Sequence, residues 1–221
     1  RQVKGVGMAK RRDEGLFGGD HEEQSAPLAR RMRPRTFAEF AGQAHVLGPG
    51  KPLRRFAEEG RHFSWIIFGP PGCGKSAFAW LVAASAQAHF VSINAVTSNV
   101  AELKSAIEAA SARLRYEGRR TLLFIDEIHR LNRTVEEVLY PAMEDFCIDI
   151  IIGKGPSART LRLDLPKFTL IGATTRAGML SAPLRDRFGV ISRLEYYQEE
   201  DLIKIIKRAA TILDVEITPE G

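Results

Sequence analysis

The sequence predicts an α/β fold built on a parallel five-stranded sheet with helices on both faces. The first observation is the segment WIIF at 65–68, a short apolar run that leads directly into the glycine-rich sequence GPPGCGKS. The second is the regular alternation of strand-like apolar runs with helical patterns, because strands joined through helices form parallel sheets. The third is the run TLLFIDE at 121–127, which ends in two adjacent carboxylates.

Five apolar segments are predicted as strands: 65–68, 89–95, 121–127, 168–175 and 189–196. Between the first two, the sequence is apolar on nearly all sides, as a helix covered by the sheet and its neighbours would be. Asn99 precedes Glu102 by three positions, which is a helix-capping pattern, and apolar residues then recur at helical spacing. Residues 134–146 fit a further helix.

The segment 148–165 is predicted to form a β-hairpin inserted before the fourth strand. Apolar residues alternate with polar ones in both of its halves, and a turn rich in Gly and Pro separates them. The apolar face of this hairpin either projects towards a partner or packs on its own domain, and the pattern alone favours neither.

Three regions are expected along the chain. Residues 1–26 are rich in Gly and charged residues without periodicity, which predicts a disordered tail. Residues 27–195 form the nucleotide-binding domain. Residues 196–221 contain an amphipathic helix with acidic residues at its start, and we interpret them as the beginning of a truncated helical lid.

The composition is that of an ordinary globular protein, with 44% hydrophobic and 27% charged residues in 221. It contains no apolar run long enough to span a membrane and no signal-peptide pattern, and its two cysteines are too few for a disulfide framework. We therefore expect a cytoplasmic protein without membrane contact. A net charge of +5 is compatible with nucleic-acid binding but is also common on solvated surfaces.

The glycine-rich loop matches G-x-x-x-x-G-K-[ST], a pattern whose backbone N–H groups surround phosphate oxygens. Lys75 is expected to reach the β- and γ-phosphates of ATP, and the Ser76 hydroxyl is expected to ligate Mg²⁺. Cys73 is interpreted as a spacer. A glycine turn that binds nothing is disfavoured by the strand before the loop and the helix after it. The predicted nucleotide-binding residues here are Gly69, Pro70, Pro71, Gly72, Cys73, Gly74, Lys75, Ser76 and Ala77.

Polar residues at the ends of later strands complete the predicted site. Asp126 is expected to hold Mg²⁺ through water, and Glu127 to orient or deprotonate the attacking water; the alternative is a simple helix cap. Thr174 and Thr175 end the next strand, where a hydroxyl either senses the γ-phosphate or merely reflects the preference of Thr for strands. Arg187 suits a bidentate contact with a phosphoryl group, or else belongs to a local Arg–Asp surface pair.

Together these motifs resemble the AAA+ ATPases, and two families within them. Residues 27–133, with PLARRMRPRTFAEFAGQAHVLGPGKPLRR and IDEIHRLNR, are similar to the RarA (or MgsA) recombination ATPases. Residues from about 134 to 221, with VEEVLYPAMEDF, DIIIGKGPSARTLRLDLPKFTLIGATTRAG and PLRDRFGVISRLEYY, resemble RuvB, the Holliday-junction branch-migration motor. The sequence is thus a hybrid of the two patterns.

The resemblance implies roles for further residues. It implies that Thr175 is the first sensor and that Arg187 is an arginine finger donated to a neighbouring subunit, so that Lys75, Glu127, Thr175 and Arg187 form the catalytic set. It also implies nucleotide contacts by residues outside the loop: Met32, Arg33, Glu144, Asp145, Phe146 and Tyr197. The hairpin at 148–165 matches the element of RuvB that docks its partner RuvA.

The expected function is that of an ATP-hydrolysing DNA motor, RuvB-like in its mechanical parts. It would form a homo-oligomeric ring, a hexamer if RuvB-like, and act on four-way or forked DNA in recombination and repair. One alternative is a clamp-loader-like ATPase of the RarA type at stalled replication forks. The other is a nucleotide-binding docking module with little turnover, because the expected lid is incomplete and RuvB's second arginine sensor has no counterpart in these residues.

Overall fold

The computed structural model describes residues 27–59, 64–152 and 159–218. The chain divides into two compact units, Arg1–Met32 and Arg33–Gly221, which are considered separately. The described part of the first unit holds one short helix, α2 (Leu28–Arg31). The disorder expected for residues 1–26 falls outside the described residues.

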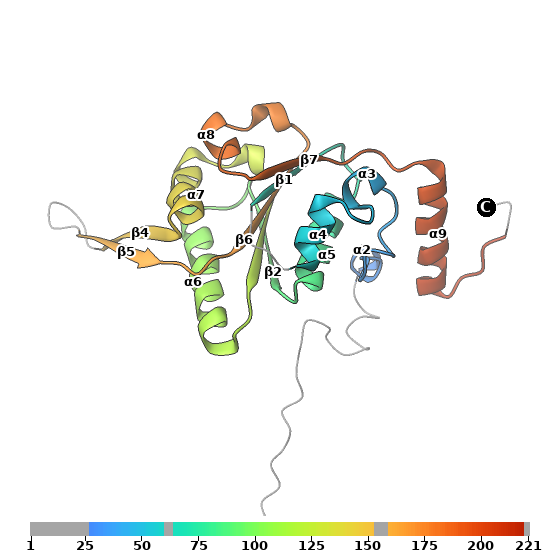
Figure 1. The fold of residues 1–221 in the computed structure, drawn as a ribbon, viewed down its shortest axis with the longest axis horizontal. Helices are drawn as coiled ribbons and strands as arrows, with labels where there is room; N and C mark the ends of the chain where they lie inside the picture. The colour runs from blue at the N-terminus through green and yellow to red at the C-terminus, as the bar shows by residue number, and fades with distance from the viewer. Residues whose placement is uncertain (1–26, 60–63, 153–158, 219–221) are drawn as a thin grey trace, which may run out of the picture. The chain divides into compact units, whose positions relative to one another are not determined.

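The second unit contains the predicted parallel sheet (Figure 1), with five strands in the order β2-β3-β6-β1-β7. These strands are β1 (Trp65–Phe68), β2 (His89–Asn94), β3 (Thr121–Asp126), β6 (Thr169–Thr174) and β7 (Val190–Arg193). The last strand is shorter than the 189–196 expected. Leu194 N–H still bonds to Phe68 O at 2.8 Å, but the main chain of Glu195 pairs with the Gln43 side chain instead of with β1.

Helices cover both faces of the sheet, with α6 and α7 on one side and α4 and α5 on the other (Figure 1). The helices in the described residues of this unit are α3 (Ala44–Leu47), α4 (Pro52–Glu58), α5 (Lys75–Ser85), α6 (Val100–Glu117), η1 (Ile128–Arg130), α7 (Arg133–Glu144), η3 (Ala177–Met179), α8 (Ala182–Arg185) and α9 (Glu199–Leu213). The predicted cap of α6 is confirmed, because Asn99 Oδ1 accepts from Glu102 N–H at 2.9 Å. Helix α7 ends two residues before the predicted 146, since Phe146 has a left-handed φ of 51°.

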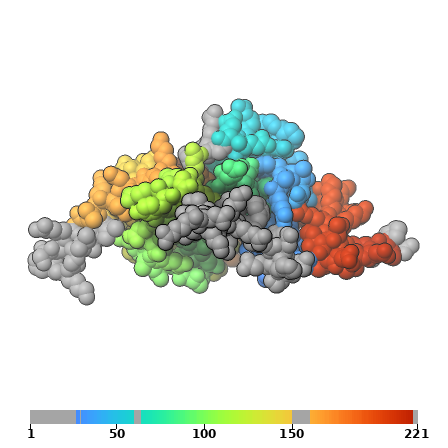
Figure 2. Space-filling view, turned by 90° about the horizontal axis from the view of Figure 1, so that it is seen from below, coloured from blue at the N-terminus to red at the C-terminus, as the bar shows by residue number. Residues whose placement is uncertain are grey.

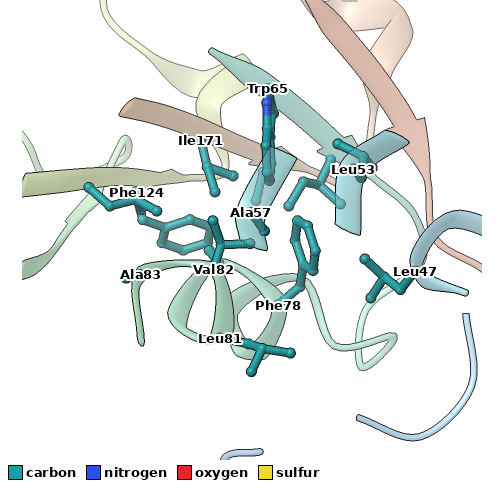
Figure 3. Packing of buried hydrophobic residues seen from close by; sticks show 14 of the residues in the cluster. Leu47, Leu53, Ala57, Trp65, Phe78, Leu81, Val82, Ala83, Phe124 and Ile171 are labelled. Atoms are coloured by element: carbon teal, nitrogen blue, oxygen red, sulfur yellow. The ribbon is translucent and has the colours of Figure 1, made fainter. Parts of the chain in front are cut away.

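The core consists of two apolar clusters, one on each face of the sheet. Strand β1 contributes to both, because successive side chains point to opposite faces: Trp65 and Ile67 face α5, whereas Ile66 faces α6 and α7. In the first cluster, the ring of Trp65 stacks on Phe78 of α5 with centroids 5.8 Å apart (Figure 3). The strand that precedes the glycine-rich loop is therefore fixed from both sides.

The predicted hairpin is confirmed as a separate two-stranded antiparallel sheet of β4 (Cys147–Ile152) and β5 (Arg159–Asp164). Near its base, Ile148 lies opposite Leu163 and is fully buried in the second core cluster. Further out, Leu161 is 51% exposed. The base of the hairpin thus packs on its own domain, as one interpretation expected. The outer half presents an apolar residue to solvent, and its projection towards a partner stays a prediction.

Helix α9 lies at the end of the second unit opposite the hairpin (Figures 1 and 2). Arg208 ties it to the rest of the unit through an ion pair of 2.6 Å with Glu39 and a 3.2 Å hydrogen bond to Arg33 O. Its exposed apolar residues include Leu202, Ile203, Ile206 and Leu213. Among the helices described here, none is long and apolar enough to cross a membrane.

Candidate nucleotide-binding site

The site forms where three neighbouring strands of the sheet reach their carboxyl ends. Phe68 of β1 lies beside Thr174 of β6, and Gly69 N–H extends this pairing by bonding to Thr174 O at 3.2 Å. Strand β3, on the other side of β6, ends at Asp126. In open parallel sheets this edge is where ligands bind, and the structure gathers the glycine-rich loop, the acidic pair and the two threonines there as predicted.

The glycines of the loop are required by its backbone. Gly72 and Gly74 have φ values of 79° and 92°, which residues with a side chain rarely adopt. At Gly69 the space is also closed, because a Cβ would collide with Leu194 O. The sequence pattern G-x-x-x-x-G-K-S therefore reflects a loop that must turn sharply between β1 and α5.

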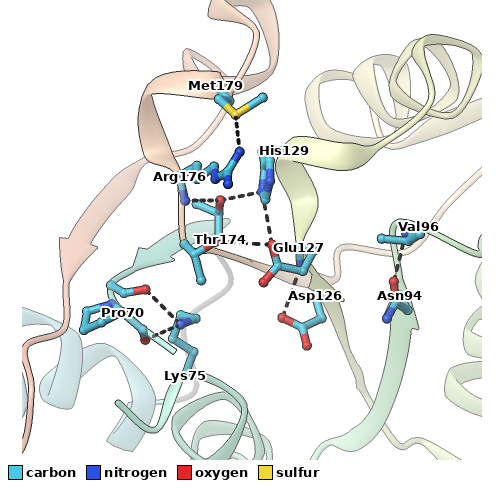
Figure 4. Close-up of polar contacts among 12 residues, drawn as sticks. Pro70, Lys75, Asn94, Val96, Asp126, Glu127, His129, Thr174, Arg176 and Met179 are labelled. Atoms are coloured by element: carbon cyan, nitrogen blue, oxygen red, sulfur yellow. Dashed lines mark hydrogen bonds and ion pairs between the residues drawn. The ribbon is translucent and has the colours of Figure 1, made fainter. Parts of the chain in front are cut away.

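Lys75 places a positive charge inside this loop. Its side chain is 8% exposed, and Nζ donates to Gly69 O at 2.9 Å and to Pro70 O at 2.7 Å (Figure 4). Helix α5 begins at Lys75, and its cap Gly74 offers no side-chain acceptor to the N–H groups of the first turn. A lysine ammonium and uncapped helical N–H groups at one loop fit the phosphates of a nucleotide.

The acidic pair has a local geometry that the sequence did not predict. Strand β3 ends at Asp126 rather than at 127, because Glu127 has a left-handed φ of 51° and leads into η1. The Oδ1 atom of Asp126 accepts from the backbone N–H of Glu127 at 3.0 Å. The turn directs the Glu127 carboxylate towards β6, where Thr175 donates to its Oε2 atom at 3.5 Å.

The two threonines have different surroundings. Thr174 is fully buried, and its Oγ1 lies 2.8 Å from Nδ1 of His129 and accepts from Arg176 N–H at 2.9 Å (Figure 4). Thr175 is exposed and contacts Glu127. Sequence reasoning missed His129, although a histidine two positions after a candidate general base is a visible signal. Burial lowers the pKa of His129; Arg130 and Arg176 lower it further, and Glu127 opposes them.

The residues available for Mg²⁺ are those expected, Ser76 at the start of α5 and Asp126 at the end of β3. No cluster of three or more His, Cys, Asp or Glu side chains suited to a metal occurs in the described ranges. A magnesium ion that is held mainly by phosphate oxygens, water and one or two protein oxygens does not require such a cluster, so the chain's donors fit it.

Arg187 belongs to a second constellation. Its guanidinium lies 4.2 Å from the centroid of the Tyr140 ring, forms a 3.0 Å ion pair with Glu144 and donates to Pro183 O at 2.5 Å. Its Nε is buried without a hydrogen-bond partner among the residues described. The local surface pair does exist, but it joins Arg185 to Asp186 at 3.7 Å and leaves Arg187 out.

The remaining predicted residues are placed unevenly. Glu144 forms an ion pair with Arg187, and Asp145 is the C-cap residue of α7. The ring of Phe146 lies 5.8 Å from Nζ of Lys167. The described contacts of these three predicted residues therefore lie outside the glycine-rich loop. Tyr197, in contrast, lies against the loop, because a Cβ on Gly74 would collide with its phenol oxygen.

The Tyr197 phenol is partly buried, and this desolvation raises its pKa, with smaller contributions from Cys73 and Asp201. Of the two residues predicted on the adenine side, Met32 falls in the first unit and Arg33 in the second.

A parallel sheet with helices on both faces, a G-x-x-x-x-G-K-S loop and an adjacent Asp-Glu pair defines a P-loop ATPase of the AAA+ type. The model of the Holliday junction DNA helicase RuvB P-loop domain matches residues 32–194. The chain belongs to this family, whose P-loop domains use ATP with Mg²⁺. The match includes most of the segment that resembles RarA, and that resemblance stays a prediction.

Solved structures of RuvB from Thermotoga maritima are similar to this chain. The RuvB Holliday junction branch migration motor is 38% identical with a TM-score of 0.67, and the match covers 85% of this chain and 56% of that one. A RuvB mutant from the same organism is 39% identical with a TM-score of 0.68, covering 84% and 57%. The chain thus spans little more than half the length of these relatives.

Proposed function

We propose that this chain is the ATP-hydrolysing part of a RuvB-like motor that migrates Holliday junctions in recombination and repair. The observation that carries the proposal is the shared edge of the sheet at which three groups follow neighbouring strands. Glu127 comes directly after β3 and Thr175 directly after β6, and Lys75 begins α5 at the end of the loop that follows β1. These groups supply the charge, the general base and the polar contact that phosphoryl transfer to water needs.

ATP with Mg²⁺ supplies the phosphoanhydride bond that is hydrolysed and the metal charge that neutralises its oxygens. Lys75 and the N–H groups at the start of α5 bind the phosphates, and Ser76 and Asp126 hold the ion. Glu127 accepts the proton of the attacking water, and Thr175 restrains the glutamate from the β6 side. The Tyr197 phenol packs against the glycine-rich loop at Gly74.

The proposal extends to the assembly. Arg187, 22% exposed at the side chain, would be the finger that reaches the nucleotide of the next subunit in a homo-oligomeric ring, a hexamer if RuvB-like. The DNA substrate would be a four-way or forked junction, and the location cytoplasmic. The support here is family membership and resemblance.

The direct test is ATP binding and hydrolysis by single-residue variants. Lys75→Ala should abolish binding of a fluorescent ATP analogue. Glu127→Gln should bind it within about threefold of the parent but lose phosphate release by a factor of about 10² or more, the range for a general base. Glu108→Gln, an exposed change on α6, is the matched control. Equal turnover in Glu127→Gln and the parent would refute the assigned base.

A docking role is the second candidate, and the exposed Leu161 on β5 favours it. In that case a RuvA-like protein should be retained by the chain in a pull-down, and Leu161→Ser should abolish retention. Thr160→Ser, one residue earlier and on the opposite face of the strand, is the control. Retention that is unaffected by Leu161→Ser would exclude this surface.

A further inference from the structure

We propose that His129 is a positioning residue for Glu127, holding its carboxylate through an Nδ1–H hydrogen bond that is anchored on Thr174 of β6. The functional consequence rests on the proposed role of Glu127 as general base, whereas the hydrogen-bond arrangement itself does not. The inference assigns a role to a buried imidazole that neither binds the phosphates nor ligates the metal in the site described above.

The contacts place His129 between Glu127 and Thr174, the last residue of β6 (Figure 4). Its side chain is 2% exposed, and its Nδ1 atom lies 2.8 Å from Thr174 Oγ1 and 3.3 Å from Glu127 Oε2. The contact from Thr175 to the same carboxylate oxygen is longer, at 3.5 Å. The imidazole nitrogen is therefore the nearer of these two groups to Glu127.

The hydrogen positions follow from what each atom can accept or donate. An ionised carboxylate only accepts hydrogen bonds, so a favourable contact at Glu127 requires that Nδ1 of His129 carry the hydrogen. That hydrogen is then shared between Glu127 Oε2 and Thr174 Oγ1. In the opposite arrangement, with the Thr174 hydroxyl donating to a bare Nδ1, a nitrogen lone pair would face the carboxylate oxygen. Burial lowers the pKa of His129, which favours the neutral imidazole with a single ring hydrogen to be placed.

The fold explains why the imidazole is held so closely. Ile128 is fully buried and packs over Gly172, where the missing side chain lets η1 approach β6. The same approach brings His129 against Thr174, whose hydroxyl also accepts from Arg176 N–H. Glu127 has a left-handed backbone and a flexible side chain, so a fixed donor at His129 restricts its carboxylate in addition to the 3.5 Å contact from Thr175.

The first test separates a positioning role from a structural one by using side chains of graded similarity. His129→Leu removes the donor, and kcat for ATP should fall by up to about 10²-fold, as misplacement of a catalytic group does, while affinity for the fluorescent ATP analogue stays within about twofold. His129→Asn restores an N–H near the position of Nδ1, and kcat should recover to within a few-fold of the parent.

His129→Gln, whose amide reaches the position of Nε2 instead, should not restore kcat. The matched control is His89→Asn, a partly buried histidine at the opposite end of the sheet, which should leave kcat unchanged. Equal kcat in His129→Leu and the parent, or equal losses in His129→Leu and His129→Asn, would overturn the proposal.

The second test reads the tautomer directly and does not depend on ATP turnover. Among the five histidines of the chain, the ¹⁵N signals of His129 are identified by their loss in His129→Asn. Long-range ¹⁵N correlation spectra at neutral pH should show a protonated Nδ1 and an unprotonated Nε2 in the parent. In Glu127→Ala, the hydrogen should move to Nε2, because the Thr174 hydroxyl can then donate to Nδ1. An Nε2–H tautomer in the parent would refute the contact, whereas absent hydrolysis with the expected tautomer would refute only the proposed function.

Discussion

The contact between Gly172 and Ile128 offers the sharpest test of how the fold positions the turn from Glu127 into η1. A Cβ added to Gly172, in the middle of β6, would lie 2.6 Å from Ile128 Cδ1 and 3.2 Å from Ile128 Cγ2. Both residues are inside the core, and Ile128 stands between Glu127 and His129 in the sequence. Gly172→Ala should therefore force η1 away from the sheet.

The expected magnitude combines two opposing effects. Overpacking of a well-filled core costs about 1–3 kcal/mol. Replacing Gly by Ala in an ordinary backbone conformation stabilises the folded protein by about 0.4–1 kcal/mol, because the unfolded chain loses conformational entropy. The difference spans about 0–2.6 kcal/mol. Because the conflict at 2.6 Å is severe and lies in the core, Gly172→Ala should lower the free energy of unfolding by about 1–2 kcal/mol, near the middle of this range. Ile128→Val alone should cost about 0.5–1.5 kcal/mol for the lost methyl group.

The double variant carries the decisive information. Val has no Cδ1 atom, so the 2.6 Å conflict disappears in Gly172→Ala/Ile128→Val. The loss in the double variant should be smaller than the sum of the two single losses by about 1 kcal/mol, which is a typical coupling for residues in contact. Urea unfolding followed by tryptophan fluorescence measures all four proteins. Gly178→Ala is the control, because a Cβ at Gly178 would meet no atom within 4 Å.

Additive losses, or a loss below about 0.5 kcal/mol in Gly172→Ala, would refute the reasoning. The same variants also report on the site. If η1 positions the base, Gly172→Ala should lower kcat for ATP, and Ile128→Val in the same chain should recover part of it.

Three further outcomes follow from single contacts. Asn99→Ala removes the cap of α6 and should lower the free energy of unfolding in urea by about 1 kcal/mol; an unchanged value would show that the cap is not used. Gln43→Ala removes two hydrogen bonds, of 2.7 and 3.0 Å, to the main chain of Glu195, and should cost about 1–3 kcal/mol, whereas no loss would mean that water replaces the amide. Because the folded pKa of Tyr197 is raised above its usual value of about 10, its contribution to stability is fully present below that pH and is lost as pH rises through the folded pKa. Tyr197→Phe should therefore remove part of the alkaline loss in unfolding free energy, and identical alkaline profiles for the variant and the parent would contradict this assignment.

The sheet and the glycine-rich loop could be predicted because their signals are local. Each strand is marked by an alternating or continuous apolar run. The glycine pattern of the loop reports the positive φ angles of Gly72 and Gly74, which glycine adopts most readily. The carboxyl-edge position of Asp126 then follows from the rule that parallel strands end at one edge. None of these steps needs a contact between distant side chains.

The contacts that were missed are all long-range and made by side chains. Gln43 bonds to the main chain of Glu195 across 152 residues, and His129 lies against Thr174 across 45. A single glutamine or histidine has no periodicity, so no pattern identifies its partner. The predicted end of the third strand at 127 was wrong, because Glu127 has a left-handed backbone and the strand ends at Asp126. The residue type of Glu127 gives no sign of that conformation.

Arg187 shows how the two kinds of information combine. The sequence alone did not decide whether Arg187 forms a surface ion pair or contacts a phosphate, because two arginines flank Asp186. The structure gives the surface pair to Arg185 and places Arg187 between Tyr140 and Glu144 of α7. A guanidinium that is stacked on one face and paired at its edge has lost most of its rotational freedom before it meets any ligand. Such an arrangement orders the Arg187 side chain against α7, and its task as a finger stays a proposal that rests on the resemblance.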